Sequence, residues 1–149
     1  MGVSDEIRNK ILKAIEAKDG NALELAVNLA FQAGLPNDLS DIFAETLLMP
    51  WHRRHEDLSS ALQEMKAPNS VNALFQAALS HHAYLDHDEF FGLARKCAWA
   101  LADIGTPEAK ERLQELARYE NGVIAGYAQK RLDHWQDELL RKGKSTGSL

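Results

Sequence analysis

The segment from Leu93 to Leu113 constrains the fold more than any other part of this 149-residue chain. Its sequence, LARKCAWALADIGTPEAKERL, contains an apolar stripe at helical spacing. The stripe consists of Leu93, Cys97, Leu101 and Ile104, separated by steps of 4, 4 and 3. Gly105 favours the left-handed conformation that ends a helix, and Thr106 followed by Pro107 is typical of the start of the next helix. A second apolar stripe follows this short corner, so the segment predicts an antiparallel helical hairpin.

The start of this hairpin recurs along the chain. Pro36, Pro68 and Pro107 each open a predicted helix, and the intervals between them are 32 and 39 residues. A large aliphatic residue follows each proline at the sixth position, namely Ile42, Leu74 and Leu113. The extra length of the second interval falls in the polar segment 81–89. Periods of this size with two helices each are typical of helical repeat proteins.

The IGTPEA corner and the two-helix period resemble the HEAT-like repeat family, in its PBS-lyase form. The resemblance is clearest over residues 36–140. It implies an all-α fold, a short right-handed α-solenoid of antiparallel helix pairs with about eight helices. We predict a single solenoid domain over 1–142 and a disordered tail over 143–149. Within the domain, we expect a capping helix pair at 1–35 and repeats at 36–67, 68–105 and 106–142.

Composition and charge argue against several classes of function. The formal net charge of −5 disfavours nucleic-acid or anionic-membrane partners, because such sites usually need clustered positive charge. No run approaches the roughly 18 to 20 apolar residues needed to span a membrane, and the first residues lack the apolar core of a signal peptide. The only cysteine, Cys97, leaves no intrachain disulfide to form. We expect a soluble cytoplasmic protein.

The resemblance places a binding surface on the second helix of each repeat, since HEAT-like solenoids usually bind through side chains that line their concave face. Ser60, Trp99 and Lys130 share one column of the repeat alignment, where related repeats usually carry a polar residue. Trp99 lies between Arg95 and Asp103 at i ± 4, and a tryptophan flanked by charges is typical of an interface hot spot. The alternative is that Trp99 packs in the core between repeats, as large aromatic residues often do. The expected partner contacts are Arg95, Trp99, Asp103, Glu56, His52, Lys130 and His134.

Segment 51–57 contains the densest cluster of ionisable residues. His52 and Glu56 share a helical face, with His55 beside them, and a divalent metal could bind all three. HEAT-like deoxyhypusine hydroxylases hold a di-iron site with such His-Glu pairs on several helices, but only the pair His55 and Glu56 matches that pattern here. A first helical turn explains the acidic residues more simply, and a packed position explains His55. We therefore predict no catalytic residue, metal or cofactor.

The polar connection 81–89 also carries residues that could bind a metal, but its spacing matches no known site. As the longest connection in the chain, it is a candidate for partner contact.

These features favour a protein-binding module that acts through its concave face. It could be an adaptor or, by analogy with some HEAT-like immunity proteins, a small bacterial protein that neutralises a toxin. The alternative is a metal-dependent or lyase-like HEAT enzyme, or an accessory to one. A third possibility is a structural subunit of a larger assembly. The sequence leaves the identity of the partner and the oligomeric state open.

Overall fold

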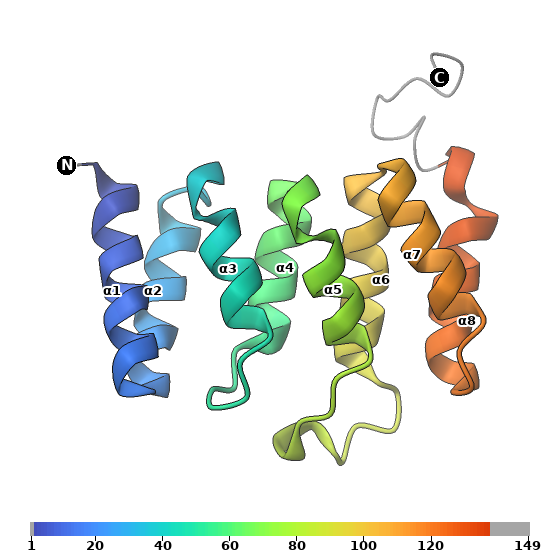
Figure 1. Ribbon diagram of the computed structural model, residues 1–149, viewed down its shortest axis with the longest axis horizontal. Helices are drawn as coiled ribbons and strands as arrows, with labels where there is room; N and C mark the ends of the chain where they lie inside the picture. Colours follow the sequence, from blue (N-terminus) through green and yellow to red (C-terminus); the bar gives the residue numbers. More distant parts are fainter. Residues whose placement is uncertain (1, 138–149) are drawn as a thin grey trace.

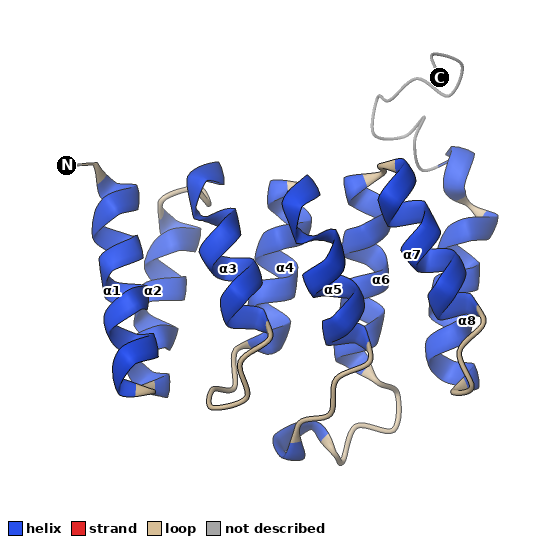
Figure 2. Cartoon of the chain, viewed as in Figure 1, coloured by secondary structure: helices blue, strands red, loops and turns tan. Residues whose placement is uncertain are grey.

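The computed structural model describes residues 2–137, which form helices and connecting loops without a β-strand (Figure 2). The α-helices are α1 (Val3–Ala17), α2 (Gly20–Gln32), α3 (Ser40–Leu47), α4 (His55–Met65), α5 (Val71–Ala78), α6 (Gly92–Ile104), α7 (Pro107–Ala117) and α8 (Gly122–Asp133). Short 3-10 turns are η1 (Asn37–Leu39), η2 (Pro68–Ser70) and η3 (Ala83–Leu85). None of the described helices has both the length and the apolar character required to traverse a lipid bilayer. The expected tail, 143–149, lies outside the described residues.

The helices stack as antiparallel pairs in two rows (Figure 1). The first helices of the pairs, α1, α3, α5 and α7, form one row, and the second helices, α2, α4, α6 and α8, form the row behind it. Helix α6 contacts four neighbours, α4, α5, α7 and α8. The all-α solenoid predicted from the sequence is therefore confirmed, while the boundaries of the individual repeats stay a prediction.

The apolar stripes of the helices meet between the two rows and form one core. Leu58 and Leu62 of α4, with Leu101 of α6, are completely buried. Burying each leucine contributes about 2 kcal/mol relative to leaving it exposed. Helix α6 adds four small buried residues, Ala94, Ala98, Ala100 and Ala102, each at most 4% exposed. These small side chains allow the neighbouring helices to approach α6 closely.

The corner between α6 and α7 has the predicted geometry. Gly105 adopts a left-handed φ of 69°, and its N–H donates to the carbonyl of Leu101 at 3.1 Å. The Thr106 hydroxyl accepts from the N–H of Ala109 at 3.1 Å, so Thr106 caps α7. Both contacts satisfy backbone groups that the helix ends would otherwise leave without a partner.

The capping preference of Asp88 predicts that a helix begins at about residue 88, but α6 begins at Gly92. The Asp88 carboxylate accepts from the N–H of Phe90 at 3.0 Å and from the N–H of Gly92 at 2.8 Å. Phe91 has a left-handed φ of 52°, which is incompatible with continuing the helix. The connection 79–91 is therefore a loop that contains η3, and it projects from the end of the α5–α6 pair (Figure 1).

Helix α8 ends earlier than predicted, at Asp133, with His134 as its C-cap residue. The apolar spacing of Ile124, Ala128, Leu132, Trp135 and Leu139 predicts a helix that continues to about Leu139. Trp135 is half-buried and packs against the core from beyond the end of the helix, and Leu139 lies outside the described residues.

Candidate functional site

A recess of about 310 Å³ opens between α6 and α8. Its walls combine three aromatic and three cationic side chains, namely Phe90, Tyr127, Trp99, Arg95, Lys130 and Arg131. No carboxylate is among these lining residues. The recess therefore offers aromatic surface and positive charge together, on a protein whose overall charge is negative.

Trp99 lines this recess and packs against a buried cation. The guanidinium carbon of Arg131 lies 3.7 Å from the centroid of the indole ring, which is the geometry of a cation–π contact. Arg131 is only 6% exposed, whereas Trp99 is half-buried. From the sequence, Trp99 was either an interface residue or a core residue. The structure combines the two, because one part of the ring packs inside the protein and another part lines the recess.

The remaining cations of the recess are oriented toward solvent. Arg95 and Lys130 are exposed, and neither forms an ion pair with any residue in the described range. Phe90 is 75% exposed, and its backbone carbonyl accepts a hydrogen bond from the Tyr127 hydroxyl. This hydrogen bond fixes the loop before α6 against α8, so that Phe90 forms one edge of the recess.

Three of the seven predicted partner contacts, Arg95, Trp99 and Lys130, come together in this recess. Asp103 lies one turn further along α6, where its Oδ2 atom accepts from the Gln63 side chain at 2.7 Å and links α6 to α4. His134 is exposed at the end of α8.

The predicted contact Glu56 is not a lining residue of the recess and lies beside the loop before α6. It lines a hollow of about 280 Å³ together with Asp88, Glu89 and other residues of that loop. Its side chain also approaches the N-terminus of α6, because a Cβ atom built on Gly92 would lie 3.1 Å from a Glu56 carboxylate oxygen.

The predicted surface position of His52 requires correction, since the side chain is only 2% exposed. Its Nε2–H donates to the carbonyl of Thr46 at 2.7 Å, and its Nδ1 accepts from the N–H of Arg54 at 2.9 Å. Burial lowers the pKa of this imidazole. Both ring nitrogens are used within the protein, which leaves neither of them for a partner or a metal ion.

His52 belongs to a stack of three histidine rings. The centroid of His55 lies 4.1 Å from that of His52 and 3.7 Å from that of His82. His55 hydrogen-bonds through Nε2 to the carbonyl of Met49 and through Nδ1 to the Tyr84 hydroxyl, at 2.7 and 2.6 Å. Burial lowers the pKa of His55 to about 4, so the ring is neutral at pH 7. The stack therefore attaches the loop after α5 to the start of α4.

The metal site considered from the sequence would use His52, His55 and Glu56. The hydrogen bonds of the two histidines occupy the nitrogens that such a site would require. Across residues 2–137, no group of three or more His, Cys, Asp or Glu side chains is arranged to hold a metal ion.

Sequence reasoning missed three residues of the recess, Phe90, Tyr127 and Arg131. For Arg131 a signal was present in the repeat alignment, because it directly follows Lys130, as Ala61 follows Ser60 and Ala100 follows Trp99. Both alanines are completely buried. An arginine in a core column must bring a partner for its charge, and an aromatic ring on the preceding repeat is such a partner. No comparable pattern marked Phe90 or Tyr127.

Residues 93–119 match the family model of the PBS lyase HEAT-like repeat. The matched segment contains nearly all of α6, the corner at Gly105 and the whole of α7. No curated protein and no solved structure gave a significant match to the chain. The family resemblance inferred from the corner is therefore confirmed for this repeat.

Proposed function

We propose that this chain, an all-helical protein with a PBS lyase HEAT-like repeat at residues 93–119, binds another protein through the face formed by its second helices. The observation that carries the proposal is the recess between α6 and α8, which a half-buried tryptophan lines together with two solvent-exposed cations. Tryptophan, tyrosine and arginine are the residue types that most often dominate binding energy at protein interfaces.

The packing of Trp99 supports its role as the anchor of this surface. Its contact with the buried Arg131 orders the indole before binding, so that little conformational entropy remains to be lost when a partner docks. Arg95 and Lys130 line the same recess and are exposed, so their charges are available to a partner. An aspartate or glutamate beside an apolar side chain on the partner is the complement of this arrangement.

The same surface disfavours a nucleic acid as the partner. Exposed acidic residues of α4, Asp57 and Glu64, lie on the helix next to α6 and would repel an extended polyanion. The recess contributes three cations, Arg95, Lys130 and Arg131, whereas a nucleic-acid groove requires positive charge along the path of the backbone.

Two biological roles are compatible with a protein-binding recess of this kind. A cytoplasmic adaptor, or an immunity protein that neutralises a bacterial toxin, would act through such a recess. A toxin gene beside the gene for this protein would favour the immunity role.

Charge-reversal variants test the proposed surface. Wild-type protein, Arg95→Glu and Lys130→Glu are immobilised separately, and the proteins that each retains from native extract are quantified by mass spectrometry. The control is Lys10→Glu, which makes the same charge change at an exposed position on α1. We expect a partner that the wild type and the control retain, with recovery falling about tenfold for both recess variants.

The variants are chosen so that loss of binding can be interpreted. Arg95 and Lys130 are exposed, so their substitution should leave the helical circular dichroism unchanged. If every specifically retained protein binds both recess variants as well as it binds the control, the proposed function is wrong.

A further inference from the structure

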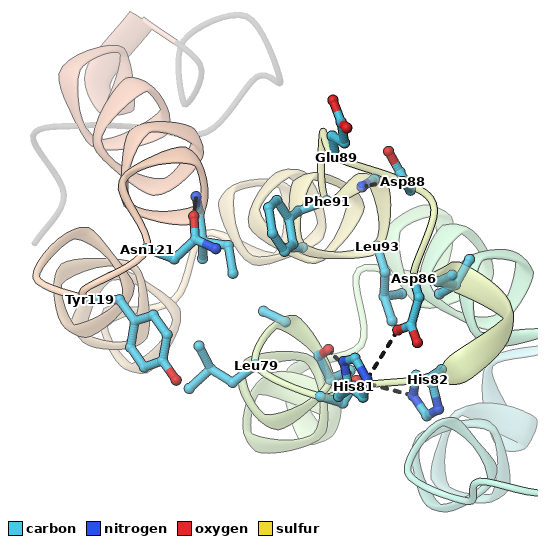
Figure 3. Close-up of a pocket in the computed structure, with 17 residues that line it drawn as sticks. Leu79, His81, His82, Asp86, Asp88, Glu89, Phe91, Leu93, Tyr119 and Asn121 are labelled. Carbon is cyan, nitrogen blue, oxygen red and sulfur yellow. Dashed lines mark hydrogen bonds and ion pairs between the residues drawn. The ribbon is translucent and has the colours of Figure 1, made fainter.

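Segment 80–87, the part of the connection before α6 that contains η3, forms one side of a cavity of about 560 Å³ (Figure 3). Figure 3 shows His82 and Asp86 of this segment on one side of the open space, with Tyr119 and Asn121 on the other. The wall between them is apolar and consists of Ala77, Ala78 and Leu79 at the end of α5 and Leu93 and Ala94 of α6. The position of segment 80–87 therefore affects how accessible this apolar wall is to solvent.

Segment 80–87 is only loosely packed against the helices. Each of its eight residues is half-buried or exposed, and none is buried. Leu85 is its apolar side chain that packs against the core. A segment that buries so little apolar surface can detach while the helices stay folded. Its position therefore depends on a small number of specific contacts.

Two of these contacts converge on His55 at the start of α4. The ring centroid of His82 lies 3.7 Å from that of His55, and the Tyr84 hydroxyl lies 2.6 Å from His55 Nδ1. Because His55 Nε2–H donates to the carbonyl of Met49, Nδ1 of the neutral ring must accept from the Tyr84 hydroxyl. The side chain of His55 is completely buried, whereas His82 and Tyr84 are half-buried. Segment 80–87 thus covers His55 from the solvent side.

The histidine stack of His52, His55 and His82 accommodates neutral rings. A proton added to His55 would bind at Nδ1, the atom to which the Tyr84 hydroxyl donates. A proton added to His52 would likewise bind at Nδ1 and face the N–H of Arg54. His82 is the least buried of the three rings, so it takes up a proton most readily. Centroid separations of 4.1 and 3.7 Å then disfavour a second charge in the stack.

The surroundings of the stack offer little compensation for a positive charge. The titratable and charged residues around it are Glu24 on α2, Arg53, Arg54, Glu56 and Asp57 at and before the start of α4, His81, Tyr84 and Asp86 on the loop, and Cys97 on α6. Asp57 already pairs with Arg54, and Asp86 with His81. None of the three stacked rings forms an ion pair with a carboxylate in the part of the chain that the structure describes.

We infer that the histidine stack is a pH-dependent switch, which holds segment 80–87 against α4 at neutral pH and releases it on acidification, so that the apolar wall of the cavity becomes accessible. Release exposes His82 and His55 to water, where a histidine has a pKa of about 6.5. Burial in the closed arrangement lowers the pKa of both rings, to about 4 for His55. The closed arrangement is therefore fully favoured above pH 6.5 and loses this advantage as the pH falls toward 4.

The switch is separate from the proposed protein-binding surface. Phe90, which forms one edge of the recess at Trp99, has its own attachments, because its N–H donates to Asp88 and its carbonyl accepts from Tyr127. The cavity and the recess share no lining residue. Release of segment 80–87 therefore leaves the recess in place.

NMR spectra of the ¹⁵N-labelled full-length protein between pH 7.5 and 4.5 test the inference. We expect the amide signals of segment 80–87 to move toward the values of an unstructured chain between pH 6.5 and 4.5. The amide signals of α2 and α7 and the helical circular dichroism should stay unchanged over this range. The fluorescence of added 1-anilinonaphthalene-8-sulfonate should rise with the same midpoint, because the dye binds exposed apolar surface.

A matched pair of variants identifies the groups that take up protons. His82→Phe keeps an aromatic ring in the stack but removes one protonation site, so its transition should have a lower midpoint and be about half as steep. His87→Phe makes the same change at an exposed position on the same loop and should titrate as the wild type does. Tyr84→Phe removes the hydroxyl that donates to His55, and its midpoint should rise by about 0.5 to 1 pH unit.

Three outcomes would overturn the inference. The first is that the signals of segment 80–87 do not move between pH 7.5 and 4.5. The second is that they move only together with the loss of helical circular dichroism, which would mean that the segment unfolds with the whole protein. The third is a wild-type transition in His82→Phe or, if that variant does not fold, in Tyr84→Phe. Protein binding at the Trp99 recess is measured in native extract with other variants, so the two proposals can fail separately.

Discussion

The guanidinium carbon of Arg131 on α8 lies 3.7 Å from the centroid of the Trp99 ring on α6. This contact joins the second helices of two successive helix pairs through a charged side chain that is only 6% exposed. The contact therefore has two consequences, one for the stability of the solenoid and one for the shape of the surface that Trp99 presents.

Replacing Trp99 with alanine should destabilise the fold. A completely buried tryptophan costs about 3–5 kcal/mol when truncated, and Trp99 is only half-buried, so we expect a loss of about 2–3 kcal/mol. Urea denaturation followed by circular dichroism measures this loss. The control is Phe90→Ala, which removes a ring that is 75% exposed and should cost less than about 0.5 kcal/mol. A destabilisation below about 0.5 kcal/mol for Trp99→Ala would show that the indole does not pack as described.

The two residues should also be energetically coupled. In a double-mutant cycle with Trp99→Leu and Arg131→Met, both replacements keep apolar bulk while removing the ring and the charge. We expect a coupling free energy of about 0.5–2 kcal/mol, in the range of cation–π contacts away from bulk water. The cycle is measured by urea denaturation of the four proteins. Additive effects would mean that the two side chains are neighbours without a specific attraction.

The sequence predicted those parts of the fold that depend on local spacing. The stripe through Leu93 and Leu101, the left-handed Gly105 and the cap at Thr106 all involve residues within a few positions of one another. Such contacts depend on helical periodicity and on the backbone preferences of single residues. For this reason the corner is recognisable from its amino-acid sequence alone.

The site was less predictable because its residues come from separate elements. Phe90 reaches the recess only because the Asp88 carboxylate and the left-handed Phe91 delay the start of α6. Tyr127 then binds the carbonyl of Phe90 from α8. His52 was expected on the surface, but its ring is buried in the stack with His55. These arrangements depend on how loops fold back onto helices, which periodicity does not encode.

Two glycines provide a test of the start of α6. A Cβ atom on Gly92 would lie 2.8 Å from Asp88 Oδ2, the atom that accepts from the Gly92 N–H, whereas a Cβ on Gly126 would meet nothing within 4 Å. Gly126→Ala, within α8, should therefore stabilise the protein by about 0.5–1 kcal/mol. Gly92→Ala should instead destabilise it by about 1 kcal/mol. Thermal unfolding distinguishes the two, and a rise in Tm for both variants would contradict the described geometry.

Cys97 should be chemically inert in the folded protein. Its side chain is completely buried, and burial raises the pKa of the thiol to about 12, so almost no thiolate forms at pH 8. Ellman's reagent should therefore react with less than about a tenth of the protein in native buffer over an hour, and with one thiol per chain in concentrated urea. Rapid reaction in native buffer would show that α6 opens locally.

The histidine stack should make the protein sensitive to acid. A histidine in the unfolded chain has a pKa of about 6.5, whereas burial lowers the pKa of folded His55 to about 4. Between these values the unfolded chain binds a proton that the folded protein does not. The stabilisation is therefore complete above pH 6.5 and is lost progressively as the pH falls toward 4, by up to about 3 kcal/mol from this residue. Burial lowers the pKa of His52 and His82 in the same direction.

Urea denaturation at several values between pH 7.5 and 4.5 measures this effect, and His55→Gln separates it from the titration of other groups. The variant should be less stable than the wild type at pH 7.5, because it loses the stacked ring, but its stability should fall less steeply as the pH is lowered. If the variant does not fold, ring ¹³C chemical shifts of wild-type His55 give the pKa directly. A value near 6.5 would show that the ring is accessible to water and that the stack does not hold the loop against α4.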